Sequence, residues 1–200
     1  MNKKELVKEK IGKVAMQCFT KFGLDKTTLD DIAKAVGLNK ASLYYYYKNK
    51  EDIFLEVAMK EGQDFINSLQ SKVLEKTGTE ERIGYYMQER FDYYKNVLNL
   101  NRVSSETLNK LLPKFFELYD AMMKQEVKYL TQLIKDGVGS GELQEIHAGK
   151  LASSLISISD ALKHSVEQKA ILRGESDIDY SDSIREMKFL VSLIFKGLRK

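Results

Sequence analysis

The chain has 200 residues, of which 43% are hydrophobic and 30% are charged, a balance that fits a globular protein and excludes a disordered chain. Its net charge of +3 is unevenly distributed, because the first 50 residues contain 11 Lys, no Arg and five acidic residues, a local charge of +6. Such a basic segment indicates contact with a polyanion, although a solvated lysine-rich surface explains the charge equally well.

Several classes of protein are disfavoured by what the sequence lacks. Cys18 is the only cysteine, so it forms no intramolecular disulfide, and we expect it in the core of a cytoplasmic protein. The N-terminal segment has no apolar signal region, and no apolar run approaches the ~18 residues of a membrane span. Two histidines without a zinc motif, and no phosphate loop or serine elbow, argue against an enzyme. We predict no cofactor, no metal and no membrane contact.

The first 50 residues predict three helices. Residues 3–22 place apolar side chains at helical spacing, and Gly23 follows as a C-terminal glycine. Thr28 has capping-box spacing to an aspartate, which predicts a short helix that ends before Gly37. Asn39 is an N-cap for another short helix that reaches about residue 46.

The remainder of the chain is also helical in pattern. A long helix is expected from Lys50, where Asn49 is the N-cap. Further helices are expected at about 80–99, 104–112, from Pro113 to 134, 145–172 and 180–198. The fold class is therefore all-α. We predict an N-terminal three-helix helix-turn-helix head in residues 1–48 and a larger C-terminal helical bundle in residues 49–200, which would hold the ligand-binding and dimerisation functions.

The segment NKASLYYYYKNKED, residues 39–52, carries the functional hypothesis. Two short helices joined at a glycine match the helix-turn-helix unit, whose second helix enters the major groove of DNA. Leu43 and Tyr47 are four residues apart and are expected to share the core face. The other tyrosines would pack on sugars and thymine methyl groups, and their hydroxyls and the flanking lysines would reach phosphates. This surface comprises Lys40, Tyr44, Tyr45, Tyr46, Lys48 and Lys50.

Alternatives remain open at this point. The residues SLYYYY have strand-like composition. A tyrosine-rich surface also suits protein recognition, so the chain could be a helical protein-interaction module with no DNA target. Tyr44 could also be mostly structural, with only its hydroxyl exposed.

Residues 22–54, FGLDKTTLDDIAKAVGLNKASLYYYYKNKEDIF, resemble the signature of the TetR family of bacterial transcriptional regulators. The matching positions are Phe22-Gly23, Thr27-Thr28, Ile32-Ala33, Val36-Gly37, Leu43-Tyr44 and Lys48-Asn49-Lys50-Glu51. They cover only the first quarter of the chain. The resemblance implies a homodimer that binds a palindromic operator in double-stranded DNA and releases it when a small molecule binds the C-terminal body. Our leading hypothesis is a repressor that the effector releases from DNA, although the sequence does not distinguish a repressor from an activator.

The resemblance also assigns roles to single positions. Thr28 corresponds to a phosphate contact, Lys40, Ala41 and Ser42 to the groove-facing first turn, and Lys50 to the phosphate-binding lysine. Tyr44, Tyr45 and Tyr46 complete the expected DNA-binding set. Position 46 is often His in the family and position 47 often Phe, so the operator sequence cannot be predicted. The hydroxyl of Tyr47 needs a partner or a path to solvent.

The C-terminal body contains a cluster of aromatic residues. Most of them are expected in the core. Tyr86 and Tyr93 lie off the main apolar line of their helix and are candidates for the wall of an effector cavity, which would suit an apolar or aromatic effector. The expected effector-binding residues are Tyr86, Tyr93, Phe115, Tyr119, Met122, Asp160 and His164. Asp160 and His164 are four residues apart and could contact each other, as a ligand-orienting pair or as a surface or interface pair.

The last two predicted helices carry long apolar faces, and in the TetR family such helices pair across a two-fold axis. A monomer of this size does not readily bury both faces, so a dimer through a four-helix bundle is expected. The expected interface residues are Leu151, Leu155, Ile158 and Leu162 on the first helix and Met187, Leu190, Val191, Ile194 and Leu198 on the second.

Overall fold

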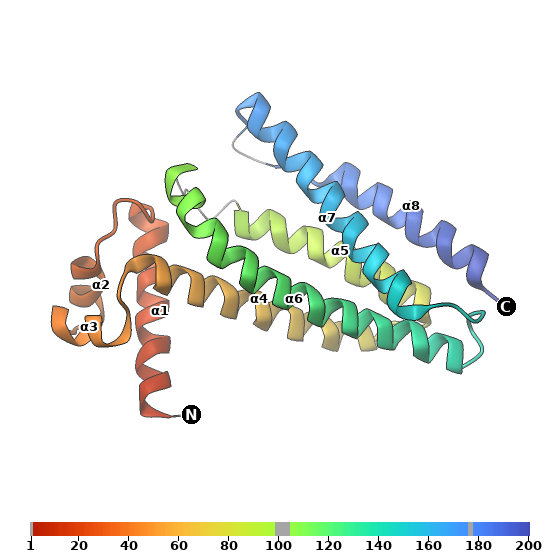
Figure 1. Cartoon of the computed structure of the whole chain (residues 1–200), viewed down its shortest axis with the longest axis horizontal. Helices are drawn as coiled ribbons and strands as arrows, with labels where there is room; N and C mark the ends of the chain where they lie inside the picture. Colours follow the sequence, from red (N-terminus) through yellow and green to blue (C-terminus); the bar gives the residue numbers. More distant parts are fainter. Residues whose placement is uncertain (1, 99–104, 176–177) are drawn as a thin grey trace. The chain divides into compact units, whose positions relative to one another are not determined.

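The computed structural model describes residues 2–98, 105–175 and 178–200, and these are almost entirely helical (Figure 1). The helices are α1 Lys3–Phe22, α2 Leu29–Val36, α3 Lys40–Tyr46, α4 Lys50–Leu74, α5 Thr79–Leu98, α6 Ser105–Gly139, α7 Ala148–Arg173 and α8 Ser181–Leu198. No strand ladder forms among the described residues, where the one isolated bridge joins Leu143 to Arg199. The predicted all-α class is confirmed.

The predicted helix boundaries in the head are confirmed to within a residue. Gly23 follows α1 and Gly37 follows α2 as C-cap residues, with positive φ angles of 84° and 79°. Glycine adopts these conformations without the steric penalty of a Cβ atom. Thr28 forms the capping box of α2, and the side chain of Asn39 accepts a hydrogen bond from the Ser42 amide at 2.7 Å. These local interactions set where each short helix starts and stops.

The chain divides into two compact units. The head unit comprises Met1–Asp64 and Leu100–Tyr119, and the body unit comprises Phe65–Asn99 and Asp120–Lys200. In the head unit one core holds Ile11, Ile32, Leu43 and Ile53, so the first turns of α4 pack with the three-helix head. Leu111 of α6 belongs to the same core. The functional boundary at residue 48 stays a prediction.

The prediction that a new helix begins at Pro113 is wrong, because α6 runs through this residue as one helix. Proline removes one amide donor and disfavours the preceding turn, but here its side chain is exposed. Apolar residues on both sides, among them Leu111 and Leu130, are buried. Burial on both flanks outweighs the lost backbone hydrogen bond, so the helix continues.

In the body unit α8 packs mainly on α5 and also on α7 (Figure 1). Ile83, Phe91 and Phe195 are fully buried there. No helix within the described residues is long and apolar enough to cross a membrane. Among these residues no three His, Cys, Asp or Glu side chains lie close enough to hold a metal ion.

Candidate nucleic-acid interface

The helical geometry of α3 separates its tyrosines into buried and exposed ones. Leu43 is fully buried, and Tyr47 directly after the helix is also buried. Tyr45 is 71% exposed and Tyr44 is about half exposed, while Tyr46 is half-buried and meets Tyr45 edge-to-face at 5.1 Å between ring centroids. The strand alternative is therefore wrong, and α3 presents two phenols to solvent.

The hydroxyl of Tyr47 has a partner in α4. It donates a hydrogen bond to Oε1 of Glu56 at 2.9 Å, and Oε2 of Glu56 pairs with Nζ of Lys8 at 2.6 Å. The same ammonium group lies 4.8 Å from the centroid of the Tyr47 ring. Burial, and then the hydrogen bond and charge of Glu56, raise the pKa of the Tyr47 phenol. This cluster joins α1, the end of α3 and α4, and it holds α3 by its C-terminal end.

Thr28 lies exposed at the start of α2. Its hydroxyl donates to Oδ2 of Asp31 at 2.6 Å, and its amide donates to the same oxygen at 2.9 Å. These two hydrogen bonds lower the pKa of the Asp31 carboxyl. The Thr28 hydroxyl is therefore already used within the capping box, and a phosphate would have to compete with Asp31 for its proton.

The predicted DNA-binding lysines are tied to neighbouring elements. Nζ of Lys40 lies 3.1 Å from Oδ2 of Asp30 in α2, and this hydrogen bond and charge raise the pKa of Lys40. Nζ of Lys50 donates to the backbone carbonyl of Asp25 at 2.8 Å. Both contacts are exposed, so either ammonium group can exchange its partner for a phosphate at little cost. Ala41 is exposed beside Lys40, and Ser42 is half-buried.

Sequence reasoning missed Lys4, whose ammonium group lies 5.4 Å from the centroid of the Tyr45 ring. The residue belongs to the first turn of α1, whereas Tyr45 lies in α3. The only signal available was the basic run at the start of the chain, because periodicity does not pair residues of different helices. Lys4 therefore adds a cation beside the most exposed phenol of α3.

The comparisons with known proteins agree with this geometry. The sequence model described as "Bacterial regulatory proteins, tetR family" matches residues 11–57. The biofilm operon icaADBC HTH-type negative transcriptional regulator IcaR of Staphylococcus epidermidis is 54% identical over 48 residues, 24% of this chain and 26% of that protein. The crystal structure of a transcriptional regulator from Cytophaga hutchinsonii superposes with a TM-score of 0.74 at 26% identity, covering 96% of this chain and 98% of that one.

Residues 11–57 thus match the TetR family of bacterial regulatory proteins. A fatty acid metabolism regulator protein of Bacillus subtilis is 24% identical over 142 residues, 71% of this chain and 73% of that protein. The match with IcaR is thus shorter and of higher identity than the match with the B. subtilis protein. Helices α2 and α3, which lie within residues 11–57, form the helix-turn-helix unit that the residue pattern predicted.

The body unit contains a buried polar cluster. Nε of Arg90 lies 2.8 Å from Oε1 of Glu126, and its two Nη atoms reach Ser159 at 2.8 Å and Asp160 at 3.4 Å. The hydroxyl of Tyr86 donates to Glu126 at 2.8 Å. Arg90 and Glu126 are each only 1% exposed. Arg90 and Glu126 each stand among apolar residues at helical spacing. This placement was a signal for burial in the sequence, and sequence reasoning missed it.

The expected effector residues are distributed as follows. Tyr86 and Asp160 both belong to the cluster around Arg90. Tyr93 stacks on Phe65 with centroids 4.1 Å apart, and Met122 is half-buried. Nδ1 of His164 lies 2.7 Å from the backbone carbonyl of Asp160, so the two residues meet through the backbone. Tyr119 belongs to the head unit, and the Phe115 side chain lies outside the described part of the structure.

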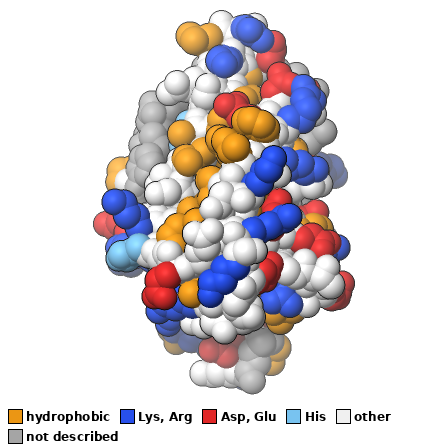
Figure 2. All heavy atoms as spheres, turned by 90° about the vertical axis from the view of Figure 1, so that its right-hand side faces the viewer, with side chains coloured by type: hydrophobic (Ala, Val, Ile, Leu, Met, Phe, Trp, Pro, Cys, Tyr) orange, Lys and Arg blue, Asp and Glu red, His pale blue; other side chains and the backbone are white. Residues whose placement is uncertain are grey.

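The expected dimer residues fall into two groups. Leu155, Met187 and Val191 are buried within the chain itself. The remaining residues are half-buried: Leu151, Ile158, Leu162, Leu190, Ile194 and Leu198. Sequence reasoning missed Phe189 and Leu193 of α8 and Leu172 of α7, which are 65%, 56% and 86% exposed. Figure 2, which views the side that carries the carboxyl end of the chain, shows hydrophobic side chains in a broken band between charged ones.

Proposed function

We propose that this protein is a repressor that binds a palindromic operator as a homodimer and is released by a small apolar or aromatic effector. The observation that supports it most directly is the surface of α3, where Tyr44 and Tyr45 are exposed beside Lys40 on a helix-turn-helix unit. In such a unit the second helix lies in the major groove.

In this proposal each group has a separate task. The rings of Tyr44, Tyr45 and Tyr46 pack on sugars and thymine methyl groups in the groove. Lys40 and Lys50 exchange their present partners for phosphates. Thr28 and the amides at the start of α2 bind a further phosphate, which favours a helix N-terminus. Ala41 and Ser42 are small, so they let α3 approach the base edges closely.

The second copy is proposed to pair through α7 and α8. The apolar residues Phe189 and Leu193 are one turn apart on the side of α8 that does not pack on α5, and Leu190 and Ile194 lie beside them. An exposed Phe of this kind is costly in a monomer, because its burial contributes roughly 1.5–3 kcal/mol. A two-fold axis brings the same surface of two chains together, which is the commonest form of homo-oligomer.

The effector is proposed to act at the cluster of Tyr86, Arg90, Glu126 and Asp160. A buried ion pair is often no more stable than apolar residues of the same volume, so its presence suggests a function. The cluster contains one cation and two carboxylates, and it adjoins the Tyr129 ring, 5.5 Å from that of Tyr86. The relative from B. subtilis is named for fatty acid metabolism, which agrees with an apolar effector.

The test is DNA binding by variants of the exposed α3 residues. Lys40→Ala and Tyr45→Ala should each weaken binding to DNA from upstream of the protein's own gene by about 10-fold, with the dimer and the thermal stability intact. Lys135→Ala, an exposed lysine of the body, is the matched control and should leave binding unchanged.

The same titration, repeated at several salt concentrations, measures how DNA affinity depends on salt. Lys40→Ala should lower the slope of log K against log salt by about one, because one phosphate contact is lost. Binding that is indifferent to salt, or equal in both α3 variants and the wild type, would contradict the proposal and favour a protein-interaction module.

A further inference from the structure

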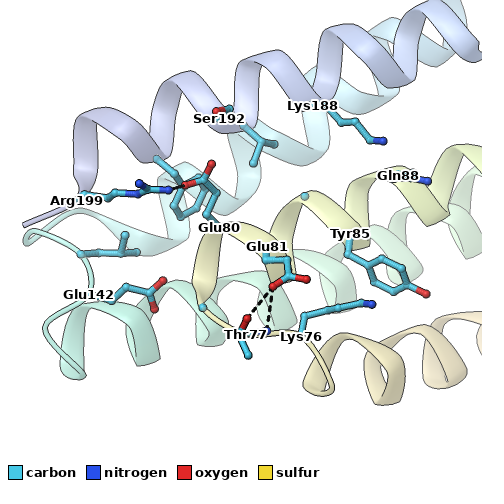
Figure 3. A pocket seen from close by; sticks show the side chains of 15 residues that line it. Lys76, Thr77, Glu80, Glu81, Tyr85, Gln88, Glu142, Lys188, Ser192 and Arg199 are labelled. Carbon is cyan, nitrogen blue, oxygen red and sulfur yellow. Dashed lines mark hydrogen bonds and ion pairs between the residues drawn. The ribbon is translucent and has the colours of Figure 1, made fainter.

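A groove of about 610 Å³ opens in the body unit, apart from the expected effector residues. The turn before α5, α5 itself, the α6–α7 connection and α8 form its walls (Figure 3). Its apolar lining consists of Leu143, Val191 and Phe195, together with the ring of Tyr85. The volume lies within the range of roughly 300–1,000 Å³ that is usual for small-molecule sites.

Every acidic side chain that lines the groove already has a partner. Glu81 accepts hydrogen bonds from the amide and hydroxyl of Thr77. Glu142 accepts the amide of Thr79 at 2.6 Å and its hydroxyl at 2.8 Å, so it serves as the cap of α5. The third acidic residue, Glu80, pairs with Arg199. These carboxylates hold the walls of the groove together.

The two lysines of the groove, unlike its carboxylates, make no ion pair among the described residues. Lys76 lies 4.4 Å above the Tyr85 ring but makes no ion pair among the described residues. Lys188 of α8 is exposed, and within the described part of the chain it has neither a hydrogen bond nor an ion pair. The helix positions three and four residues from Lys188 hold Ile184, Arg185, Val191 and Ser192, so no neighbour on its helix neutralises it.

Tyr85 supplies a neutral donor between these two lysines (Figure 3). Burial, and then the charges of Glu89 and Glu75, raise the pKa of its phenol, so the hydroxyl keeps its proton at neutral pH. Glu75 and Glu89 approach the phenol but do not line the groove. The groups left to meet a ligand are therefore two ammonium groups, this hydroxyl, the hydroxyl of Ser192 and the amide of Gln88.

Gly84 at the floor of the groove supports a role in ligand binding. It lies inside α5, although glycine is the poorest helix former after proline. A Cβ atom at this position would meet only Val191 Cγ1 at 3.9 Å, an ordinary contact. Packing therefore does not require glycine here, whereas any side chain would project into the groove.

We propose that this groove binds a small organic carboxylate with an apolar body. The carboxylate lies between Lys76 and Lys188, and the apolar part covers Gly84, Val191 and Phe195. The site lies on the face of α8 turned toward α5, whereas the exposed Phe189 and Leu193 lie about a third of a turn around the helix, so the ligand does not cover the side chains of the proposed dimer surface. The proposal does not depend on the protein binding DNA.

Calorimetry on the full-length protein with octanoate as the ligand tests this site. Octanoate should bind at or below about 1 mM, and octylammonium and octanol should bind at least about 10-fold more weakly. Lys188→Ala should weaken octanoate binding about 10-fold, and Lys188→Arg should restore most of it. Lys196→Ala, an exposed lysine of the same helix outside the groove, is the matched control.

Two variants of the groove floor complete the experiment. Gly84→Ala should raise the melting temperature and weaken octanoate binding slightly, and Gly84→Leu should abolish binding. No octanoate binding near 1 mM, or equal affinity for octylammonium, would overturn the proposal. So would binding that survives Lys188→Ala and disappears in Tyr86→Ala, because the ligand would then occupy the expected effector residues. Operator binding by the Lys188→Ala protein, measured separately, should match wild type, which keeps this test distinct from that of the repressor.

Discussion

Replacement of Glu126 by Leu tests whether the buried charge of Arg90 in the body unit depends on its ion pair with Glu126. Oε1 of Glu126 forms an ion pair with Nε of Arg90 at 2.8 Å, and the carboxylate accepts hydrogen bonds from Nη2 of Arg90 at 3.1 Å and from the hydroxyl of Tyr86 at 2.8 Å. Leucine has a similar volume but accepts none of them. The variant therefore removes a counter-charge from a guanidinium group that is 1% exposed, and it removes the carboxylate that accepts the hydrogen bond of the buried Tyr86 hydroxyl.

The expected loss can be worked from these contacts. Removal of one partner of a buried ion pair costs about 3–5 kcal/mol, and loss of a hydrogen bond from a buried hydroxyl adds up to about 1–3 kcal/mol. Asp160 stays 3.4 Å from Nη2 of Arg90 and can take over part of the pairing. We therefore expect the lower end, about 3–4 kcal/mol, a large share of the roughly 5–15 kcal/mol that stabilises a typical domain.

The compensating variant makes the test decisive. A protein with Arg90→Met, Glu126→Leu and Tyr86→Phe removes the charges and the hydroxyl together, and should unfold within about 1 kcal/mol of wild type. Urea unfolding at one fixed protein concentration measures both, because dimerisation makes stability depend on concentration. A loss below about 1 kcal/mol for Glu126→Leu, or a triple variant no more stable than the single one, would refute the reasoning.

Further predictions concern the head unit. Tyr47→Phe should cost about 1 kcal/mol at pH 7 through the lost bond to Glu56. Because the folded state raises the pKa of Tyr47, this contribution is complete below the unfolded value near 10 and is lost as pH rises beyond it, so urea unfolding should show the two proteins converging at alkaline pH. Asp31→Asn should destabilise α2 above pH ~4, because the folded state lowers the pKa of Asp31, and the difference in stability should vanish as pH falls. A difference in unfolding free energy that persists at pH ~2 would contradict the capping role. Asn49→Ala should cost about 1 kcal/mol, and Asn49→Ser much less, because the Asn49 side chain caps α4 through the amide of Asp52 at 2.7 Å; equal unfolding midpoints for the two variants would count against this.

The head was predictable because its signals are local. A cap such as Thr28 or Asn39 and a glycine such as Gly37 act within one turn of the chain, so they can be recognised in the sequence. The angle of 100° between successive helical residues likewise placed Tyr47 in the core and Tyr45 outside it. The helix through Pro113 was not predictable by this route, because burial of distant residues decided it.

The amino-acid sequence by itself determined the all-α class, the helix-turn-helix unit and the TetR-like signature of residues 22–54, since each depends on short-range order along the chain. Only the tertiary structure decided which residues of different helices contact each other. It showed Arg90 paired with Glu126 across 36 residues of sequence, Lys4 beside Tyr45, and the groove whose lysines come from the turn before α5 and from α8. Contacts between helices depend on how apolar faces pack in three dimensions, and helical periodicity shows which face is buried but not which residue lies opposite.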